Sequence, residues 1–110
     1  MEPLTLPADF AYLPDMYADD YFPTPQVDKV KHAIQQVASL LETGERSPKK
    51  VQKHLDKMTR QLNALQNDFA DHGSELETGA RESIAETVER LLAHFGVAID
   101  VEEALREREW

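Results

Sequence analysis

Tyrosine and aspartate side chains near the N-terminus are the residues of this sequence best suited to recognition chemistry. All three tyrosines lie between Tyr12 and Phe22, interspersed with aspartates, and every charged side chain of residues 1–23 is acidic. Aromatic rings anchor protein interfaces because they bury a large area with few rotamers to freeze. Aspartates beside them supply charge complementary to a basic partner. The pattern therefore predicts a surface that binds a basic protein or a cationic ligand.

The same residues permit two other interpretations. The rings of residues 12–22 would serve equally well as a lid over apolar seams of a helical core, with the aspartates facing water. A small-ligand-binding protein or an enzyme would instead have a pocket between this segment and the helices. That pocket would be lined by Tyr17, Tyr21, Asp15 and Glu77. The candidate binding residues of these interpretations are Tyr12, Asp15, Tyr17, Asp19, Asp20, Tyr21, Phe22 and Glu77.

Recognisable motifs for catalysis or metal binding are missing from the sequence. No serine lies in a Gly-x-Ser-x-Gly elbow, and there is no phosphate-binding glycine loop. The aspartates of residues 15–20 lack the glycine and the glutamate of a calcium-binding loop. Two pairs of aspartate and histidine one helical turn apart occur without an HExxH sequence, namely Asp28/His32 and Asp68/His72. We therefore expect no catalytic residue, metal or cofactor, and an enzyme is the less favoured class.

Composition and net charge disfavour further classes of function. The 110 residues carry a formal net charge of -9 and contain no cysteine. This charge opposes general binding to nucleic acid or to an anionic membrane. The lack of cysteine excludes disulfides and thiolate metal sites. Because no apolar run has membrane length and the N-terminus lacks a basic leader, we expect a cytoplasmic protein without membrane or nucleic-acid partners.

Three long amphipathic helices are expected to position the candidate residues. Apolar residues recur at steps of three and four from Val27 to Leu41, from Val51 to Phe69 and from Leu76 to Phe95. This spacing is the period of a helix that buries one face. A glycine follows each of the three stripes, which is typical of the residue that ends a helix.

Capping residues indicate where the helices begin. Thr24 and Ser47 each precede a proline, which is the pattern of an N-cap followed by the first helical position. Ser74 and Glu77 match a capping box, in which Glu77 reaches back to the amide of Ser74. A second capping box at Asp100 predicts a short last helix that ends near Arg108.

These elements predict an all-α fold in a single domain of residues 1–110. Short connections between the long helices favour an up-down-up three-helix bundle with a short C-terminal helix. The proline-rich residues 1–23 are expected to form an irregular, aromatic-rich segment, with one or two helical turns after Pro14, that packs on the helices of residues 24–110.

Charged side chains are segregated on two of the predicted helices. By helical geometry both sets should point away from the core into solvent, and pairing between subunits is the alternative. A homodimer that uses these faces, or the C-terminal Trp110, is therefore a further expectation. The basic stripe consists of Arg46, Lys50, Lys53, Lys57 and Arg60, and the acidic stripe of Glu82, Glu86 and Glu89.

Three separated stretches of the chain resemble one known family. They are the blocks YLPDMY, DYFP and VDK within residues 12–29, the blocks LQNDF, GSELET and ARE within residues 65–82, and REW at residues 108–110. Their order and spacing are similar to those of a family of small bacterial all-helical proteins known as a domain of unknown function. The resemblance extends over about residues 12–110. It implies a bacterial, cytoplasmic protein and brings no activity, cofactor or site residue with it.

Overall fold

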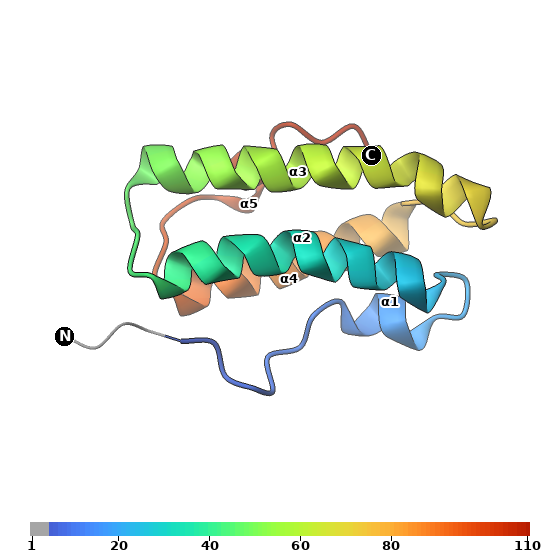
Figure 1. The fold of residues 1–110 in the computed structure, drawn as a ribbon, viewed down its shortest axis with the longest axis horizontal. Helices are drawn as coiled ribbons and strands as arrows, with labels where there is room; N and C mark the ends of the chain where they lie inside the picture. Colours follow the sequence, from blue (N-terminus) through green and yellow to red (C-terminus); the bar gives the residue numbers. More distant parts are fainter. Residues whose placement is uncertain (1–4) are drawn as a thin grey trace.

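The computed structural model describes residues 5–110, and every regular element in this range is a helix (Figure 1). The all-α class is therefore confirmed, while residues 1–4 of the segment predicted to be irregular lie outside the described range. No helix of residues 5–110 combines the length and the apolarity needed to cross a bilayer. The helices are α1 (Pro14–Ala18), α2 (Thr24–Glu42), α3 (Pro48–Asp71), α4 (Thr78–His94) and α5 (Val101–Ala104).

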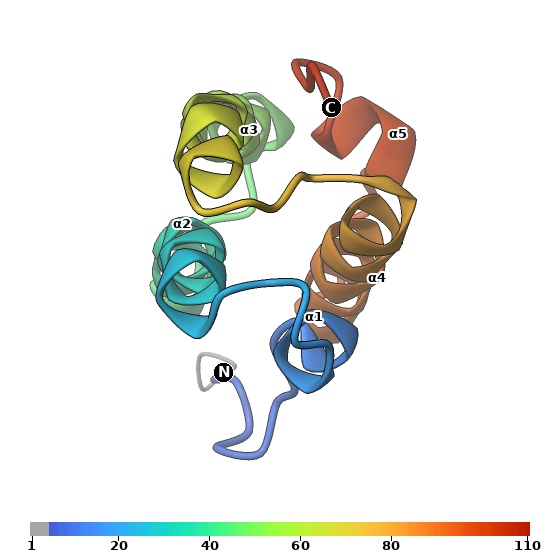
Figure 2. The same cartoon turned by 90° about the vertical axis from the view of Figure 1, so that its right-hand side faces the viewer.

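The five helices form a ring around one hydrophobic cluster, which corrects the expected three-helix bundle. In order around the ring, α2 packs on α3, α3 on α5, α5 on α4, α4 on α1, and α1 on α2 (Figure 2). The α4 helix thus meets the α2–α3 pair chiefly through the two short helices and through side chains in the centre. The three-helix prediction omits the two short helices from the core. They pack into the gaps that the apolar stripes of the three long helices leave between α4 and the α2–α3 pair.

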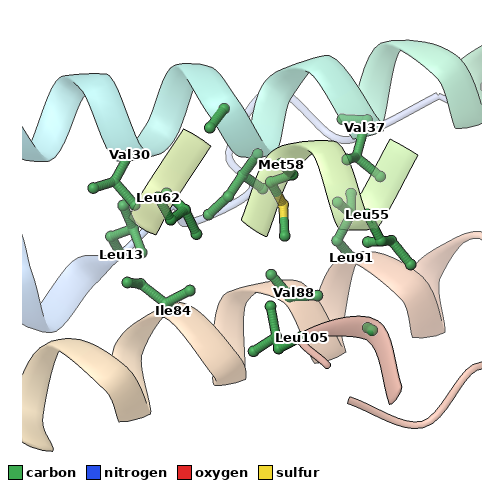
Figure 3. Packing of buried hydrophobic residues seen from close by; sticks show 14 of the residues in the cluster. Leu13, Val30, Val37, Leu55, Met58, Leu62, Ile84, Val88, Leu91 and Leu105 are labelled. Atoms are coloured by element: carbon green, nitrogen blue, oxygen red, sulfur yellow. The ribbon is translucent and has the colours of Figure 1, made fainter. Parts of the chain in front are cut away.

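The ends of the chain each insert a leucine into the core. Leu13 precedes α1 and Leu105 follows α5, and both side chains are buried. Figure 3 shows Leu13 between Val30 of α2 and Ile84 of α4. Complete burial of a leucine contributes about 1.5–3 kcal/mol, so each insertion fastens a terminal segment to the ring.

Leu13 holds an unusual backbone conformation at the point where the N-terminal segment enters the core. Its φ of 52° is left-handed, and no other residue of 5–110 except glycine has a positive φ. Its amide donates a hydrogen bond of 3.1 Å to Oγ1 of Thr87, which is also fully buried. The following Pro14 restricts Leu13 from the right-handed helical region. The left-handed form costs about 1–2 kcal/mol, which the burial and the hydrogen bond offset.

The apolar stripes are buried as predicted, with Leu65 as the exception. Leu65 stays partly exposed, whereas the remaining stripe residues of α2, α3 and α4 are buried. Its side chain lies at the surface between α2 and α3, beside Lys29 and Ala33.

The predicted N-caps are correct for α3 and α5, at Ser47 and Asp100, and wrong for α2 and α4. Ser47 is the N-cap of α3, although its side chain makes no capping hydrogen bond, and the N-cap of α2 is Pro23 rather than Thr24. The capping box at Ser74 does not form. Instead Glu77 is the N-cap of α4 and accepts a hydrogen bond from the Gly79 amide at 3.1 Å. Because α3 and α4 are not direct neighbours, residues 72–77 must cross between them before a helix can begin (Figure 2).

Polar contacts hold the C-terminal residues on α3. Two nitrogens of Arg106, Nε and Nη2, donate to the Asp56 carboxylate at 3.1 Å and 2.7 Å. Asn63 donates to the Glu107 carbonyl at 2.8 Å and accepts from the Glu109 amide at 3.0 Å. Hydrogen bonds from the Arg106 guanidinium lower the pKa of Asp56 below its ordinary value. The short last helix ends at Ala104, and the residues after it form turns rather than the helix expected to reach Arg108.

A substitution of Thr87 tests the anchoring of the N-terminal segment. Thr87→Val keeps the side-chain volume and removes the acceptor of the Leu13 amide. We expect the free energy of unfolding to fall by about 1–3 kcal/mol, because a buried amide loses its only partner. Urea unfolding followed by circular dichroism measures the change.

Thr59→Val is the matched control for this variant. Thr59 is equally buried, but its hydroxyl donates only to the Leu55 carbonyl of its own helix. Its loss should therefore destabilise the protein less than half as much. Equal losses in the two variants would contradict the anchoring role of Thr87.

The ion pair of Asp56 and Arg106 predicts how stability depends on pH. A carboxylate whose pKa is lower in the folded than in the unfolded protein stabilises the fold above the unfolded pKa, and this stabilisation is lost as pH falls through the folded pKa. Asp56→Asn should therefore cost about 1 kcal/mol near pH 7 and progressively less toward about pH 3. Urea unfolding across this range measures the difference from the native protein. Glu103→Gln is the control, because Glu103 is exposed and binds the same arginine, and a loss for Asp56→Asn that is independent of pH would refute the assignment.

Candidate functional site

Most residues of the first two stretches that carry the family resemblance lie at one end of the ring, which we call the α1 end. This end consists of α1, the loop of residues 19–23, the first turns of α2 and α4, the last turns of α3 and the loop of residues 72–77 (Figures 1 and 2). Arg108 lines a hollow together with Thr78 and Arg81 at the start of α4. All three stretches, far apart in sequence, therefore contribute to neighbouring parts of the surface.

A hydrogen bond joins α1 to α2 at this end. The Tyr17 hydroxyl donates to the Asp28 carboxylate. Burial raises the pKa of Tyr17, and the hydrogen bond to Asp28 and its negative charge raise the pKa further. Tyr17 is consequently a neutral donor at physiological pH, and it serves as a tether rather than as a free binding group.

An ion pair joins α2 to α3 one residue further along. The Lys29 ammonium lies 2.6 Å from the Asp68 carboxylate and lowers the pKa of that carboxyl group by donating a hydrogen bond. The Asp68 carbonyl also lies 2.8 Å from Nδ1 of His72 at the end of α3. Both groups of the ion pair remain open to water, so its contribution to stability is small.

A groove of about 380 Å³ opens beside these two contacts. It runs between α2 and α3, and Leu65, the one stripe residue left partly exposed, forms part of its apolar wall. Gln61 is a further lining residue, and its Oε1 is buried without a hydrogen-bond partner. The groove is lined by Asp28, Lys29, His32, Ala33, Gln36, Gln61 and Leu65. None of the candidate residues expected from the sequence belongs to this lining.

Tyr21 and Phe22 occupy opposite environments in the loop before α2. Phe22 is buried, whereas Tyr21 is 44% exposed and is the only large hydrophobic side chain of residues 5–110 with that degree of exposure. Their rings meet edge to face with centroids 5.1 Å apart. The Tyr21 amide donates to the Asp19 side chain at 2.9 Å, which closes the turn. The hydrogen bond to Asp19 and the buried ring of Phe22 therefore hold the loop backbone from which Tyr21 extends into solvent.

The four acidic candidates at the α1 end are exposed and have no ion-pair partner among residues 5–110. Asp15, Asp19, Asp20 and Glu77 all face water. None of them belongs to an ion pair with a basic side chain of residues 5–110, whereas Lys29 is paired with Asp68. Within the described residues no three histidine, aspartate or glutamate side chains converge where a metal ion would bind. The α1 end therefore carries four exposed carboxylates without ion-pair partners, two of which, Asp19 and Asp20, precede the exposed Tyr21 in its loop.

Tyr12, the remaining candidate, lies away from Tyr21 in a second hollow. This hollow of about 430 Å³ separates residues 6–12 from α2. Tyr12 packs against Phe10 with ring centroids 5.0 Å apart, and the Lys31 ammonium lies 5.6 Å from its ring centroid. Burial raises the pKa of Tyr12, and the Glu42 carboxylate raises it further.

The second hollow lies where a pocket was expected, between the N-terminal segment and the helices, but its residues differ. Tyr17, Tyr21, Asp15 and Glu77 do not line it. Lys31 and Glu42 do, and sequence reasoning missed both because they fall on α2 among many charged helical residues. The lining is Leu6, Pro7, Ala8, Phe10, Tyr12, Lys31, Gln35, Ala38, Ser39 and Glu42.

The fold and the α1 end together define a small all-helical protein with an acidic, tyrosine-bearing end. Residues 7–110 match the family of unknown function DUF5713, and the chain belongs to that family. The resemblance to an uncharacterised domain family noted from the sequence is thus confirmed. No curated protein and no solved structure matches the chain.

The contact between Tyr17 and Asp28 predicts a shift in the ionisation of Tyr17. Asp28→Asn removes the negative charge and the carboxylate acceptor, so the pKa of Tyr17 should fall toward the ordinary value of a tyrosine. Tyrosine Cζ chemical shifts followed by NMR through alkaline pH, within the range where circular dichroism shows an intact fold, measure this value. Asp68→Asn removes a nearby carboxylate that does not bind Tyr17 and should leave the ionisation unchanged. Identical titration of Tyr17 in the native protein and in Asp28→Asn would contradict the assignment.

Proposed function

We propose that this protein is a non-enzymatic interaction module whose α1 end binds a basic segment of another protein. The observation that carries the proposal is Tyr21, a large side chain held in solvent among acidic groups that have no cationic partner. An exposed ring of this kind has no role in the core, because the neighbouring Phe22 fills that position. Tyrosine is among the residues that dominate binding energy when they are buried at the centre of an interface.

Electrostatics favours a basic partner. The carboxylates of Asp15, Asp19, Asp20 and Glu77 are available because no basic side chain of residues 5–110 neutralises them. Complementary charge accelerates association and selects against acidic partners. The protein as a whole carries a net charge of -9, which adds to the attraction at long range.

The groove between α2 and α3 extends the same surface. Its wall includes Asp28, which is exposed and whose carboxylate has a second oxygen besides the one that accepts from Tyr17, so it suits the donors of a lysine or arginine side chain. The exposed part of Leu65 offers an apolar contact for the stem of such a side chain. We therefore place Tyr21 at one edge of the interface and the groove at another.

A second candidate function is the binding of a small ligand beside Tyr12. The hollow of about 430 Å³ between residues 6–12 and α2 favours it, since it brings a tyrosine, Lys31 and Glu42 to one cavity. A single metabolite that raises the melting temperature would support this function, because a ligand that binds only the native state stabilises it. Tyr12→Phe should then reduce that stabilisation while Tyr21→Ala leaves it unchanged.

Capture and titration of a basic partner test the proposed interaction. The immobilised native protein should retain a basic protein from the native cell lysate at low ionic strength. With that partner purified, Tyr21→Ala should weaken binding by about tenfold or more in calorimetric titration, as expected for an aromatic anchor. Asp19→Asn combined with Asp20→Asn should also weaken it, and added salt should weaken binding of the native protein.

The matched control removes the same number of charges from another face. Glu86 and Glu89 are exposed on the outer side of α4, so Glu86→Gln combined with Glu89→Gln should bind the partner with nearly native affinity. Equal loss of binding in the two double variants, or an affinity that does not change with salt, would contradict the proposal.

A further inference from the structure

Arg46 departs from the outer basic stripe expected from the sequence. It belongs to the loop between α2 and α3, which lies at the end of the ring opposite the α1 end (Figure 1). Its side-chain contacts show that it turns toward the helix ends rather than outward. Its Nε donates to the Phe95 carbonyl at 3.0 Å, and its Nη1 donates to the Leu41 carbonyl at 2.8 Å. The guanidinium carbon also lies 5.2 Å from the Phe95 ring centroid. The carbonyls in the last turns of α2 and α4 lie at the negative ends of the helix dipoles, which explains why they attract this cation.

These contacts fix the guanidinium without neutralising its charge. Arg46 forms no ion pair with a carboxylate of residues 5–110, and no hydrogen-bond partner of its Nη2 occurs there. The side chain is partly buried. A cation that is partly removed from water and held by neutral carbonyls still gains electrostatic free energy when it binds an anion. Because the guanidinium is already immobilised, it loses little further conformational entropy on binding.

A hollow of about 370 Å³ adjoins this arginine. Most of its wall is apolar and comes from the residues that follow α4, with Val97 and Ile99 partly buried and Ala98 exposed. Pro48, the first residue of α3, completes the opposite side. The hollow therefore combines one cationic group, which has no ion pair among residues 5–110, with a hydrocarbon surface. The exposed lysines of the basic stripe on α3 face water instead.

We propose that this hollow binds the carboxylate of a small organic acid that carries a short apolar tail. Arg46 receives the carboxylate through its free nitrogen, and Val97 and Ile99 contact the tail. A single available cation favours a monoanion over a phosphate dianion, which needs more donors. The volume lies near the lower limit of ligand sites, about 300–1,000 Å³, so the tail must be short. The carboxylate belongs either to a free acid or to the C-terminal residue of a peptide.

Titration with hexanoate tests this site directly. In two-dimensional ¹H–¹⁵N NMR of the full chain, hexanoate should cause saturable shifts of the amides of residues 96–99, while hexylammonium of the same length should cause none there. N-acetyl-alanyl-leucine and its C-terminal amide form the peptide arm, and only the free carboxylate should bind. Tighter binding of hexanoate assigns the site to free acids, and tighter binding of the peptide assigns it to a chain terminus.

Substitution of Ala98 separates binding from folding. Ala98 lines the hollow and is exposed, so Ala98→Glu places a negative charge there without disturbing the core. This variant should lose the saturable shifts, whereas Ala98→Gln, of the same size and uncharged, should keep the affinity for hexanoate within about threefold. Arg46→Gln should also abolish the shifts, although it removes contacts that hold α2 to α4. Shifts that hexanoate and hexylammonium cause equally, no saturable shift with either carboxylate, or binding that survives in Ala98→Glu would overturn the proposal.

Discussion

The space between α4 and the α2–α3 pair is the constraint on which the rest of this structure depends. Three helices of this length cannot close that space with their own stripes, so the chain fills it with Leu13 from one side and Leu105 from the other. Leu13 reaches the core only in a left-handed conformation, which the hydrogen bond of its amide to Thr87 stabilises. The terminal segments are thus parts of the core rather than covers laid over a finished bundle.

The surface of the α1 end follows from this arrangement. After Leu13 the chain must turn back across the end of the ring through α1 and the loop of residues 19–23 before α2 can begin. Burial of Phe22 in that loop leaves its neighbour Tyr21 facing solvent, with Asp19 closing the turn. An exposed tyrosine among unpaired aspartates is therefore held by the same packing that completes the core, and a partner would meet it already in position.

The two ends of the ring offer opposite chemistry. The α1 end presents Tyr21, carboxylates without ion-pair partners among residues 5–110, and a groove bordered by Asp28, all of which suit a cationic segment. The other end holds Arg46 in a mostly apolar hollow, which suits a small carboxylate. Helices terminate at both ends of the ring. Side chains of the connecting loops there do not all pack against a neighbouring helix, so they are available for binding.

The amino-acid sequence by itself determined the helical class and most of the buried faces, because apolar spacing is a local property that survives in any all-helical arrangement. It also located the tyrosines and aspartates of the α1 end, although it could not separate the tethered Tyr17 from the exposed Tyr21. Only the tertiary structure decided that α4 begins at Thr78, that Arg46 turns inward and that Leu65 borders a groove. Each of these depends on which helices become neighbours, and the closure of the ring by α1 and α5 rests on contacts between residues far apart in the chain.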